Sequence, residues 1–235
     1  MVFCFITSMI FSFEFVNTTI CPVFNFCPSV SAITGISPQR YVWRISVALH
    51  STPRLLLASV YYSHYLRKSK NVEDESKSFY KNIVKMNYWF HVTEIMALIG
   101  VTYISNKENY PVHEKIFIIF MAASISYMLS TCILSGLNKS PTPTNLENLS
   151  YRTKLFLCVI IALTSLGMMY FFYKHRVYCE ELAFSWFALC EYVICFANMA
   201  FHATIIWDMP AEEIVICLPL SHSSPNCQGM IKKNE

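Results

Sequence analysis

Ionisable side chains inside long apolar stretches are the residues of this sequence best suited to chemistry. His50 and Arg54 lie one helical turn apart, and Pro53 between them removes a helix hydrogen bond. Glu94 lies near the centre of the next apolar stretch, one turn from His91 and at a depth similar to that of Arg54. A charge near the centre of a bilayer costs at least about 2.5–3.5 kcal/mol, so such groups face the interior of a helix bundle. Arg54 and Glu94 therefore form either a structural ion pair or part of a functional polar pocket, and both interpretations stay open.

A second group of polar residues follows one face of the last apolar stretch. Asn198 and His202 lie seven and eleven residues after Glu191, which returns all three to one side of a helix over roughly 16 Å. Asn and His commonly make hydrogen bonds between helices in membrane bundles. A carboxylate and an imidazole on one face also suit general acid–base chemistry or the binding of a phosphate or hydroxyl headgroup. Glu191 and His202 therefore join His50 and Glu94 as catalytic candidates, and Asn198 joins Arg54 as a candidate for binding substrate.

No motif for a metal or a cofactor accompanies these residues. The sequence holds no HExxH motif, no GxSxG nucleophile elbow and no Gly-rich phosphate loop. The ten cysteines form no CxxC pair, so the common zinc-site spacings are absent. His113-Glu114 begins the fourth apolar run, where a helix N-terminus alone accounts for the carboxylate. We therefore expect no cofactor and no metal site.

The apolar stretches predict an all-α integral membrane protein, a bundle of about six transmembrane helices. Hydrophobic residues make up 54% of the 235 residues and charged residues only 14%, against about 25% charged in a soluble domain. A helix needs about 20 apolar residues to cross a bilayer. The last five runs meet this length, whereas the first is short and carries Glu14. The expected spans lie near residues 2–16, 41–66, 82–105, 112–137, 153–173 and 182–207, with the bundle ending at 208 and a tail over 209–235.

The basic residues predict the orientation and argue against a nucleic-acid partner. The net charge of +3 is too small for a nucleic-acid-binding surface. With a cytosolic N-terminus, ten Lys and Arg residues lie in cytosolic segments and four on the opposite side, which agrees with the positive-inside rule. The tail is then cytosolic, and Asn17-Thr18-Thr19 is a luminal glycosylation sequon. Lys232 and Lys233 match the spacing of a dilysine retrieval signal read by coat proteins, and a chance lysine pair is the alternative.

Three cysteines fall on the luminal side in this orientation, namely Cys21, Cys27 and Cys179. Disulfides persist in that oxidising compartment. A Cys21–Cys179 bond would join the first luminal loop to the last. Cys27 is an alternative partner, and free thiols are the third interpretation.

Several longer stretches carry a resemblance to a known family. They are Pro28-Ser29-Val30-Ser31, Pro38-Gln39-Arg40-Tyr41-Val42-Trp43-Arg44, Leu49-His50-Ser51-Thr52-Pro53-Arg54, His113-Glu114, Cys179-Glu180, Glu191-Tyr192, Asn198-Met199-Ala200-Phe201-His202 and Trp207-Asp208. Together they resemble the post-GPI-attachment-to-proteins factor 2 family, and the resemblance runs from the first apolar run to Asp208. The chain departs from the family pattern in its shorter first span and in its tail, which includes Cys217 and Cys227.

The resemblance implies a role in the fatty-acid remodelling of GPI anchors. The implied step restores an acyl chain to lyso-GPI, which stabilises GPI-anchored proteins at the cell surface. The implied partners are membrane lipids and GPI-anchored proteins, with an unspecified acyl donor. The implied location is the Golgi and endoplasmic reticulum membrane. The resemblance carries over no catalytic residue.

Three functional hypotheses follow from the residues and the resemblance. In an acyltransferase-like enzyme, His50 or His202 would deprotonate the lysolipid hydroxyl. Arg54 would hold the inositol-linked phosphate, and Glu94 or Glu191 would orient an imidazole. In a non-catalytic lyso-GPI-binding or scaffold subunit, the same residues would be ion pairs and headgroup contacts. A proton-coupled transporter ranks last, because the inverted repeats of such proteins are not evident.

Overall fold

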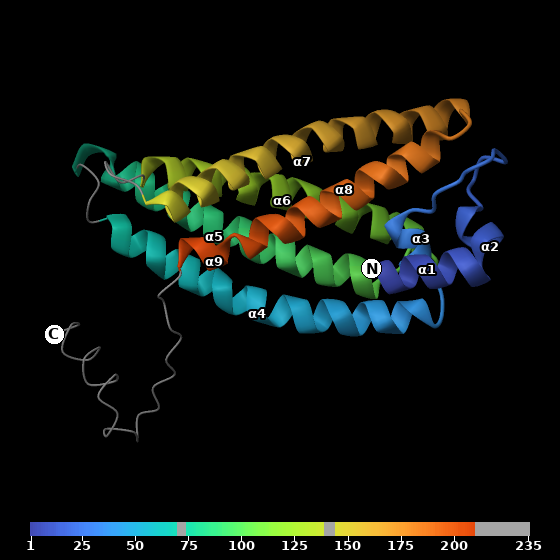
Figure 1. Cartoon of the computed structure of the whole chain (residues 1–235), viewed down its shortest axis with the longest axis horizontal. Coiled ribbons are helices and arrows are strands. Elements are labelled where there is room, and N and C mark those ends of the chain that lie inside the picture. Colours follow the sequence, from blue (N-terminus) through green and yellow to red (C-terminus); the bar gives the residue numbers. More distant parts are fainter. Residues whose placement is uncertain (70–73, 139–143, 210–235) are drawn as a thin grey trace, which may run out of the picture.

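The computed structural model describes residues 1–69, 74–138 and 144–209, and over these residues the chain consists of helices and loops without strands (Figure 1). Three short helices come first, α1 (Val2–Phe11), α2 (Phe13–Asn17) and α3 (Val30–Thr34). The long helices are α4 (Gln39–Lys68), α5 (Asp74–Tyr103), α6 (Tyr110–Leu137), α7 (Asn145–Tyr178) and α8 (Ala183–Ala203), and the short α9 (Ile205–Asp208) follows. The expectation of an all-α fold is confirmed over the described residues.

The long helices run side by side and alternate in direction, so that their connections gather at the two ends of the bundle (Figure 1). One end holds the loops after α2, α5 and α7, and we call it the loop end. The other end holds the end of α4, the start of α7 and α9. Helix α3 packs over the loop end against α4 and α8.

Three stretches of the described chain are long and apolar enough to cross a membrane, namely Tyr110–Leu137, Asn145–Tyr178 and Ala183–Asp208. The number of six spans expected from the sequence is not confirmed. The first expected span, 2–16, consists of two helices of 10 and 5 residues that are separated at Ser12. A ten-residue helix rises only about 15 Å, which is half the thickness of a bilayer core. Helix α5 also ends at Tyr103, before the expected end at 105.

Local sequence signals explain where α7 begins and ends. Thr144 and Glu147 form a capping box, in which each side chain accepts the other's backbone N–H. Cys179 ends the helix in the left-handed conformation, with φ of 48°. Leu182 also has a positive φ, of 63°, so the chain reverses tightly between α7 and α8. This reversal sets Cys179 beside the loop that follows α2.

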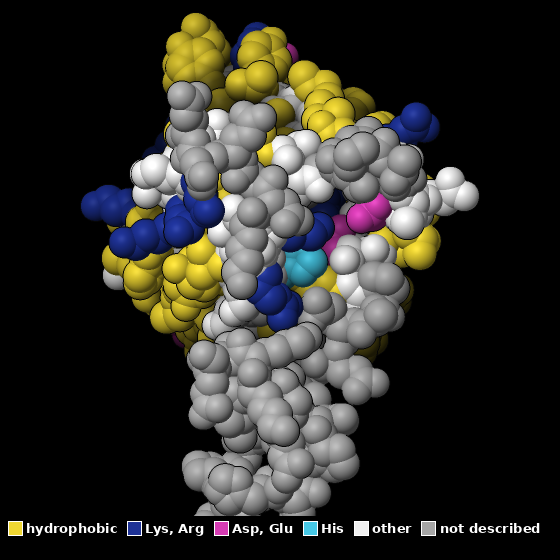
Figure 2. All heavy atoms as spheres, turned by 90° about the vertical axis from the view of Figure 1, so that its left-hand side faces the viewer, with side chains coloured by type: hydrophobic (Ala, Val, Ile, Leu, Met, Phe, Trp, Pro, Cys, Tyr) yellow, Lys and Arg dark blue, Asp and Glu magenta, His cyan; other side chains and the backbone are white. Residues whose placement is uncertain are grey.

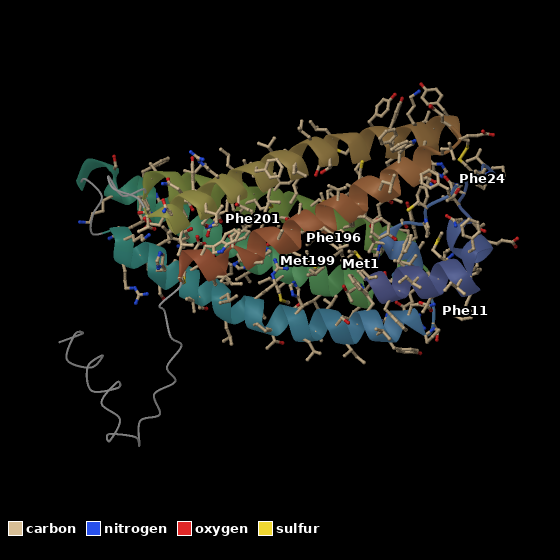
Figure 3. All side chains as sticks on the ribbon, viewed as in Figure 1. Met1, Phe11, Phe24, Phe196, Met199 and Phe201 are labelled. Atoms are coloured by element: carbon tan, nitrogen blue, oxygen red, sulfur yellow. A yellow bond between two sulfur atoms is a disulfide. The ribbon has the colours of Figure 1, made fainter. Side chains whose placement is uncertain are left out.

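Apolar side chains cover much of the outside of the bundle, while several polar ones lie inside it. Phe11, Phe24, Phe196 and Met199 are 79%, 64%, 51% and 42% exposed, whereas Phe201 is 2% exposed (Figure 3). The main apolar core joins α6, α7 and α8 through Tyr127, Met128, Cys132, Leu157, Cys158, Ile161, Ala197 and Phe201. Large exposed apolar faces exceed what a monomer in water carries, and they suit contact with lipid.

Lys and Arg side chains gather at the end of the bundle opposite the loop end, around a hollow that contains a His and acidic side chains (Figure 2). The residues that line a small cavity of about 70 Å³ at this end include Lys68, Lys154, His64 and Asp208. Asp208 accepts hydrogen bonds from the Tyr61 hydroxyl at 2.7 Å and the Ser150 hydroxyl at 2.5 Å, and it pairs with Lys154. Lys154 is a buried cation, with its side chain 2% exposed. Asp208 thus fastens the end of the last helix to α4 and α7.

Candidate functional site

A buried polar network links α4, α5 and α8 in the interior of the bundle. Glu94 of α5 is fully buried, and its Oε1 lies 3.1 Å from Nη2 of Arg54 on α4. The same oxygen accepts a hydrogen bond from Asn198 Nδ2 of α8 at 2.6 Å. Asn198 Nδ2 also donates to the Ser124 hydroxyl of α6 at 2.9 Å. His202 Nε2 lies 3.3 Å from Glu94 Oε1 and also contacts the Arg54 guanidinium.

The hydrogen-bond donors of Arg54 determine which groups of this network carry protons. A guanidinium carries only donors, so Nε2 of His202 accepts from it and the imidazole is neutral in this arrangement. The negative charge of Glu94 is then balanced by Arg54 and by the Asn198 amide. The network is therefore a self-neutralising ion pair with polar partners, and it joins α4, α5, α6 and α8.

Aromatic stacking completes the surroundings of the network. The His91 ring stacks on Tyr127 at 4.2 Å and on His202 at 5.1 Å between centroids. His50 lies on the edge, exposed on α4, with Nε2 3.4 Å from Nη1 of Arg54. The structure thus brings together five of the sequence-predicted site residues, namely His50, Arg54, Glu94, Asn198 and His202.

His91, Glu94 and His202 each place a ligand-type atom within 4.8 Å of the others, a geometry that the sequence spacing did not suggest. The Arg54 guanidinium already occupies the contacts to Glu94 and His202. A metal ion would have to displace this cation before it could bind. Nε2 of His91 and Oε2 of Glu94 are buried without a hydrogen-bond partner among the described residues, which normally costs about 1–3 kcal/mol for each group.

Glu191, the first residue of the predicted stripe, lies outside this network. Its Oε2 accepts the backbone N–H of Val30 at 2.8 Å, from the start of α3. Seven residues of helix correspond to about 10 Å along the axis. This distance carries Glu191 from the level of Asn198 to the loop end of the bundle. One face of α8 therefore serves two different sites.

A cavity of about 510 Å³ lies beside Glu191 at the loop end. Its walls are mainly apolar and come from α6, α7 and α8, with Phe117, Met121, Met168, Phe172, Phe184 and Phe187 among them. Its polar lining includes Ser31, His113 and Glu191. Two further lining residues, Ile118 and Met169, are 60% and 58% exposed on the outer surface. The cavity therefore reaches the apolar outside of the bundle between α6 and α7.

Ser31 and His113 form a hydrogen-bonded pair in this polar lining. Oγ of Ser31 lies 2.9 Å from Nε2 of His113. The other ring nitrogen, Nδ1, lies 2.7 Å from the carbonyl oxygen of Ile104. A carbonyl only accepts, so Nδ1 carries the proton and Nε2 accepts the hydrogen bond of the Ser31 hydroxyl. Sequence reasoning missed this pair, because Ser31 was noted only within a family stretch and His113 only there and, with Glu114, at the start of an apolar run.

The loop between α5 and α6 holds the Ile104 carbonyl in place. Glu108 accepts the backbone N–H of Ser105 at 2.9 Å and pairs with Arg44 of α4 at 2.8 Å. These two interactions hold the pKa of the Glu108 carboxyl at about 2, well below its usual range. Arg44 also donates to the carbonyl of Tyr103 at 2.6 Å. The loop is thus anchored on both sides of Ile104.

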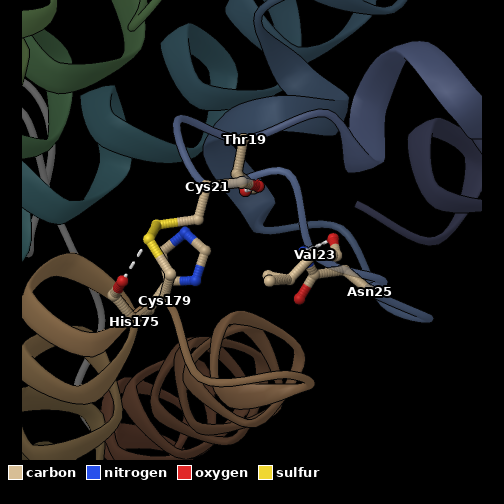
Figure 4. The surroundings of a disulfide bond; sticks show 6 residues. All are labelled: Thr19, Cys21, Val23, Asn25, His175 and Cys179. Carbon is tan, nitrogen blue, oxygen red and sulfur yellow. Dashed lines mark hydrogen bonds between the residues drawn. A yellow bond between two sulfur atoms is a disulfide. The ribbon is translucent and has the colours of Figure 1, made fainter.

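A disulfide between Cys21 and Cys179 joins the loop after α2 to the end of α7, across 158 residues of sequence (Figure 4). The His175 carbonyl lies 3.1 Å from Sγ of Cys21. Cys27 is a free, buried thiol, and burial raises its pKa, with a further contribution from the charge of Glu191. The sequence left three alternatives open for these cysteines, and the structure contains the disulfide between Cys21 and Cys179.

Gly35 allows α3 to pack closely against the loop between α5 and α6. A Cβ on Gly35 would lie 2.5 Å from Oδ1 of Asn106 and 2.9 Å from the carbonyl of Ser31. We expect Gly35→Ala to shift α3 and to destabilise the protein by about 1–3 kcal/mol through overpacking. Thermal unfolding in detergent measures this effect. Gly167→Ala is the matched control, because its nearest contact would be an ordinary 3.6 Å to Cys190 Sγ.

Comparison with known proteins identifies relatives over nearly the whole chain. Residues 1–212 match the family model described as Frag1/DRAM/Sfk1/Cwh43P N-terminal domain. A Drosophila melanogaster protein named Post-GPI attachment to proteins factor 2-like is 46% identical, over 91% of this chain and 66% of the relative. The Xenopus tropicalis protein named Acyltransferase PGAP2 is 38% identical, over 92% of this chain and 84% of the relative. No solved structure matches this chain.

Proposed function

This chain belongs to the post-GPI attachment to proteins factor 2 family, and we propose that it remodels the lipid of GPI anchors by returning an acyl chain to lyso-GPI. The name of the Xenopus relative supports acyl transfer as the reaction class. The substrates would be lyso-GPI on GPI-anchored proteins and an acyl-donating membrane lipid. The remodelled anchor would hold its protein stably at the cell surface.

The observation that carries this proposal is the cavity at the loop end. Its volume of about 510 Å³ lies within the range of about 300–1,000 Å³ that is usual for ligand sites. Its apolar walls suit an acyl chain, since each buried methylene contributes about 0.8 kcal/mol. Its polar lining includes Ser31, His113 and Glu191, which suit the ester region of a lipid. Ile118 and Met169 lie both in the lining and on the outer surface, so a lipid tail can enter directly from the bilayer.

We place the chain in the membrane as a bundle of about six segments, with a short first one. Helices α4 and α5 contain 30 residues each, or about 45 Å, which is long enough to cross. They run alongside the three strongly apolar segments (Figure 1). Their lower hydropathy comes in part from buried polar residues such as Arg54 and Glu94, which face the interior and not lipid.

The loop end is luminal in this proposal, and the opposite end is cytosolic. The Cys21–Cys179 disulfide supports an oxidising environment for the loop end. The gathering of Lys and Arg at the other end agrees with the positive-inside rule (Figure 2). Golgi and endoplasmic reticulum membranes fit this arrangement. Lys232 and Lys233, the proposed coat-protein signal, lie outside the described residues.

The buried network around Arg54 has a separate, structural role in this proposal, in which it holds neighbouring helices together. Arg54, Glu94 and His202 contact one another, and they are not among the residues that line the acyl cavity. A catalytic role for His50 or His202, and phosphate binding by Arg54, remain predictions. Substitution of each residue, with folding checked separately, tests them.

The proposed function is tested with purified protein in lipid vesicles that contain lyso-GPI and an acyl-donor phospholipid. We expect a diacyl product. Ala122→Phe, which fills part of the cavity, should reduce transfer of long acyl chains about tenfold, because the loss of roughly two buried methylenes costs about 1.6 kcal/mol. Leu166→Phe is the matched control, since Leu166 is 61% exposed and does not line the cavity.

The outcome also separates enzyme from scaffold. The acyltransferase hypothesis is supported if product forms and if Ala122→Phe lowers its formation from long acyl chains. Binding of lyso-GPI without transfer from any donor would instead support the non-catalytic subunit.

A further inference from the structure

We infer that Ser31 is the nucleophile of this acyl transfer and His113 its general base, and that the acyl group passes through an ester on Ser31. The inference rests on the proposed function for the identity of the acyl acceptor. The assignment of Ser31 as the nucleophile rests only on the geometry of the cavity at the loop end.

The Ser31–His113 pair has the three parts that an activated serine requires. The hydroxyl lies 2.9 Å from Nε2 of His113, within the range for proton transfer. The imidazole has its second nitrogen held at 2.7 Å by the Ile104 carbonyl, which selects the tautomer with a free lone pair on Nε2. Two successive hydrogen bonds therefore connect the nucleophile to the base and the base to its orienting group, as in serine–histidine enzymes of unrelated folds.

The pair is positioned where a lipid carbonyl can reach it. Ser31 is half-buried and His113 is 7% exposed, so the base is shielded while the nucleophile stays accessible. Both residues line the cavity whose walls are otherwise apolar. An acyl chain lying along Phe117 and Met121 of α6 would bring its ester carbonyl toward the polar lining. Exclusion of water by these walls favours transfer to a lipid hydroxyl over hydrolysis.

Glu191 is a positioning residue for this nucleophile. Its carboxylate accepts the N–H of Val30, the residue before Ser31, at 2.8 Å. The neighbouring Tyr192 hydroxyl donates to the Pro28 carbonyl at 3.1 Å. Helix α8 thus holds the start of α3 at a set distance from His113 on α6.

The chemistry balances with a lipid ester as donor. Nε2 of His113 takes the Ser31 proton while Oγ bonds to the donor carbonyl carbon. The bond from that carbon to the donor's alkoxy oxygen then breaks, and His113 returns the proton to this oxygen. In the second half, the lyso-GPI hydroxyl gives its proton to His113 and bonds to the acyl carbon. The Ser31 ester then breaks, and Oγ regains its proton.

The nucleophile is tested by labelling the full-length protein in membranes with a fluorophosphonate probe, which reacts with activated serines. We expect the label on Ser31, located by peptide mass spectrometry. Ser31→Ala should abolish it, and His113→Ala should slow it by about 100-fold or more, the usual contribution of a general base. Ser46→Ala is the control, because Ser46 is exposed on α4 and does not line the cavity, and it should label like the wild type.

Two further measurements keep folding and function apart. Each variant is first checked for an intact Cys21–Cys179 bond by thiol alkylation. Glu191→Gln, which keeps an acceptor for the Val30 N–H, should retain labelling near the wild-type rate, whereas Glu191→Ala should lose most of it. Equal loss in both variants would contradict the positioning role. Incubation with a donor phospholipid alone should add one acyl mass to the peptide that contains Ser31.

The results distinguish this inference from the proposed function. If Ser31→Ala transfers acyl groups to lyso-GPI as fast as the wild type does, the assignment of Ser31 as nucleophile is overturned. The proposed function then still stands. Labelling and acylation of Ser31 without any transfer to lyso-GPI would support the nucleophile and overturn the proposed acceptor. A folded wild-type protein without any label on Ser31 would also overturn the nucleophile.

Discussion

Replacement of either Arg54 or Glu94 alone is expected to destabilise the protein by about 3–5 kcal/mol, the usual cost of leaving one buried charge without its partner. Their side chains are 4% and 0% exposed and lie 3.1 Å apart, so water cannot take the place of the lost partner. The double replacement Arg54→Met with Glu94→Leu removes both charges together. We expect it to recover most of the stability, because volume-matched apolar residues often replace a buried ion pair at little cost. Thermal unfolding of each variant in detergent measures the difference.

Arg40→Ala is the matched control for this series. Arg40 pairs with Glu108 at 3.2 Å, but the two side chains are 23% and 41% exposed, so its loss should cost no more than about 1 kcal/mol. Measurement of acyl transfer in the same variants decides the role of the network. A double variant that is stable and active supports a purely structural role for Arg54 and Glu94. A double variant that is stable but inactive would return Arg54 and Glu94 to the catalytic or substrate-binding roles.

Loss of the Cys21–Cys179 disulfide is the second large effect that we expect, at about 2 kcal/mol. The bond closes a segment of 158 residues, and the chain-entropy model assigns about 2–4 kcal/mol to a typical disulfide. The lower value is expected here because membrane insertion already restricts the unfolded chain. Cys21→Ser and Cys179→Ser should have equal effects, and the double variant should be no worse than either. Thermal unfolding with and without a reducing agent measures the effect.

Cys27→Ser provides the control for the pairing itself. Cys27 is a free, buried thiol near the same end of the bundle, so its removal should leave the number of reducible disulfides unchanged. Alkylation before and after reduction, followed by mass spectrometry, counts them. One newly reactive thiol or a scrambled bond in this variant would show that Cys27 shares the pairing. A variant of Cys21 with unchanged stability would contradict the structural role of the bond.

The sequence by itself determined the class of the fold and the depth of the polar residues. Apolar runs of about 20 residues can satisfy their backbone in lipid as helices, and helices are the regular elements of the described residues. Arg54 and Glu94 were expected at one depth because helical rise converts sequence position into height, and they lie 3.1 Å apart. Helical periodicity also set Asn198 and His202 on one face, where both contact Glu94.

Only the tertiary structure decided which of these residues share a site. Periodicity gives the face and height of a residue on its own helix, but not the element that packs against it at that height. Glu191 therefore separated from its stripe, because the short helix α3 folds over the loop end and presents Val30 to it. The same folding brought Ser31 to His113, 82 residues away. Helix α3 has only five residues, too few to show a helical period from which such a contact could be predicted, so the proposed nucleophile became visible only once the packing was known.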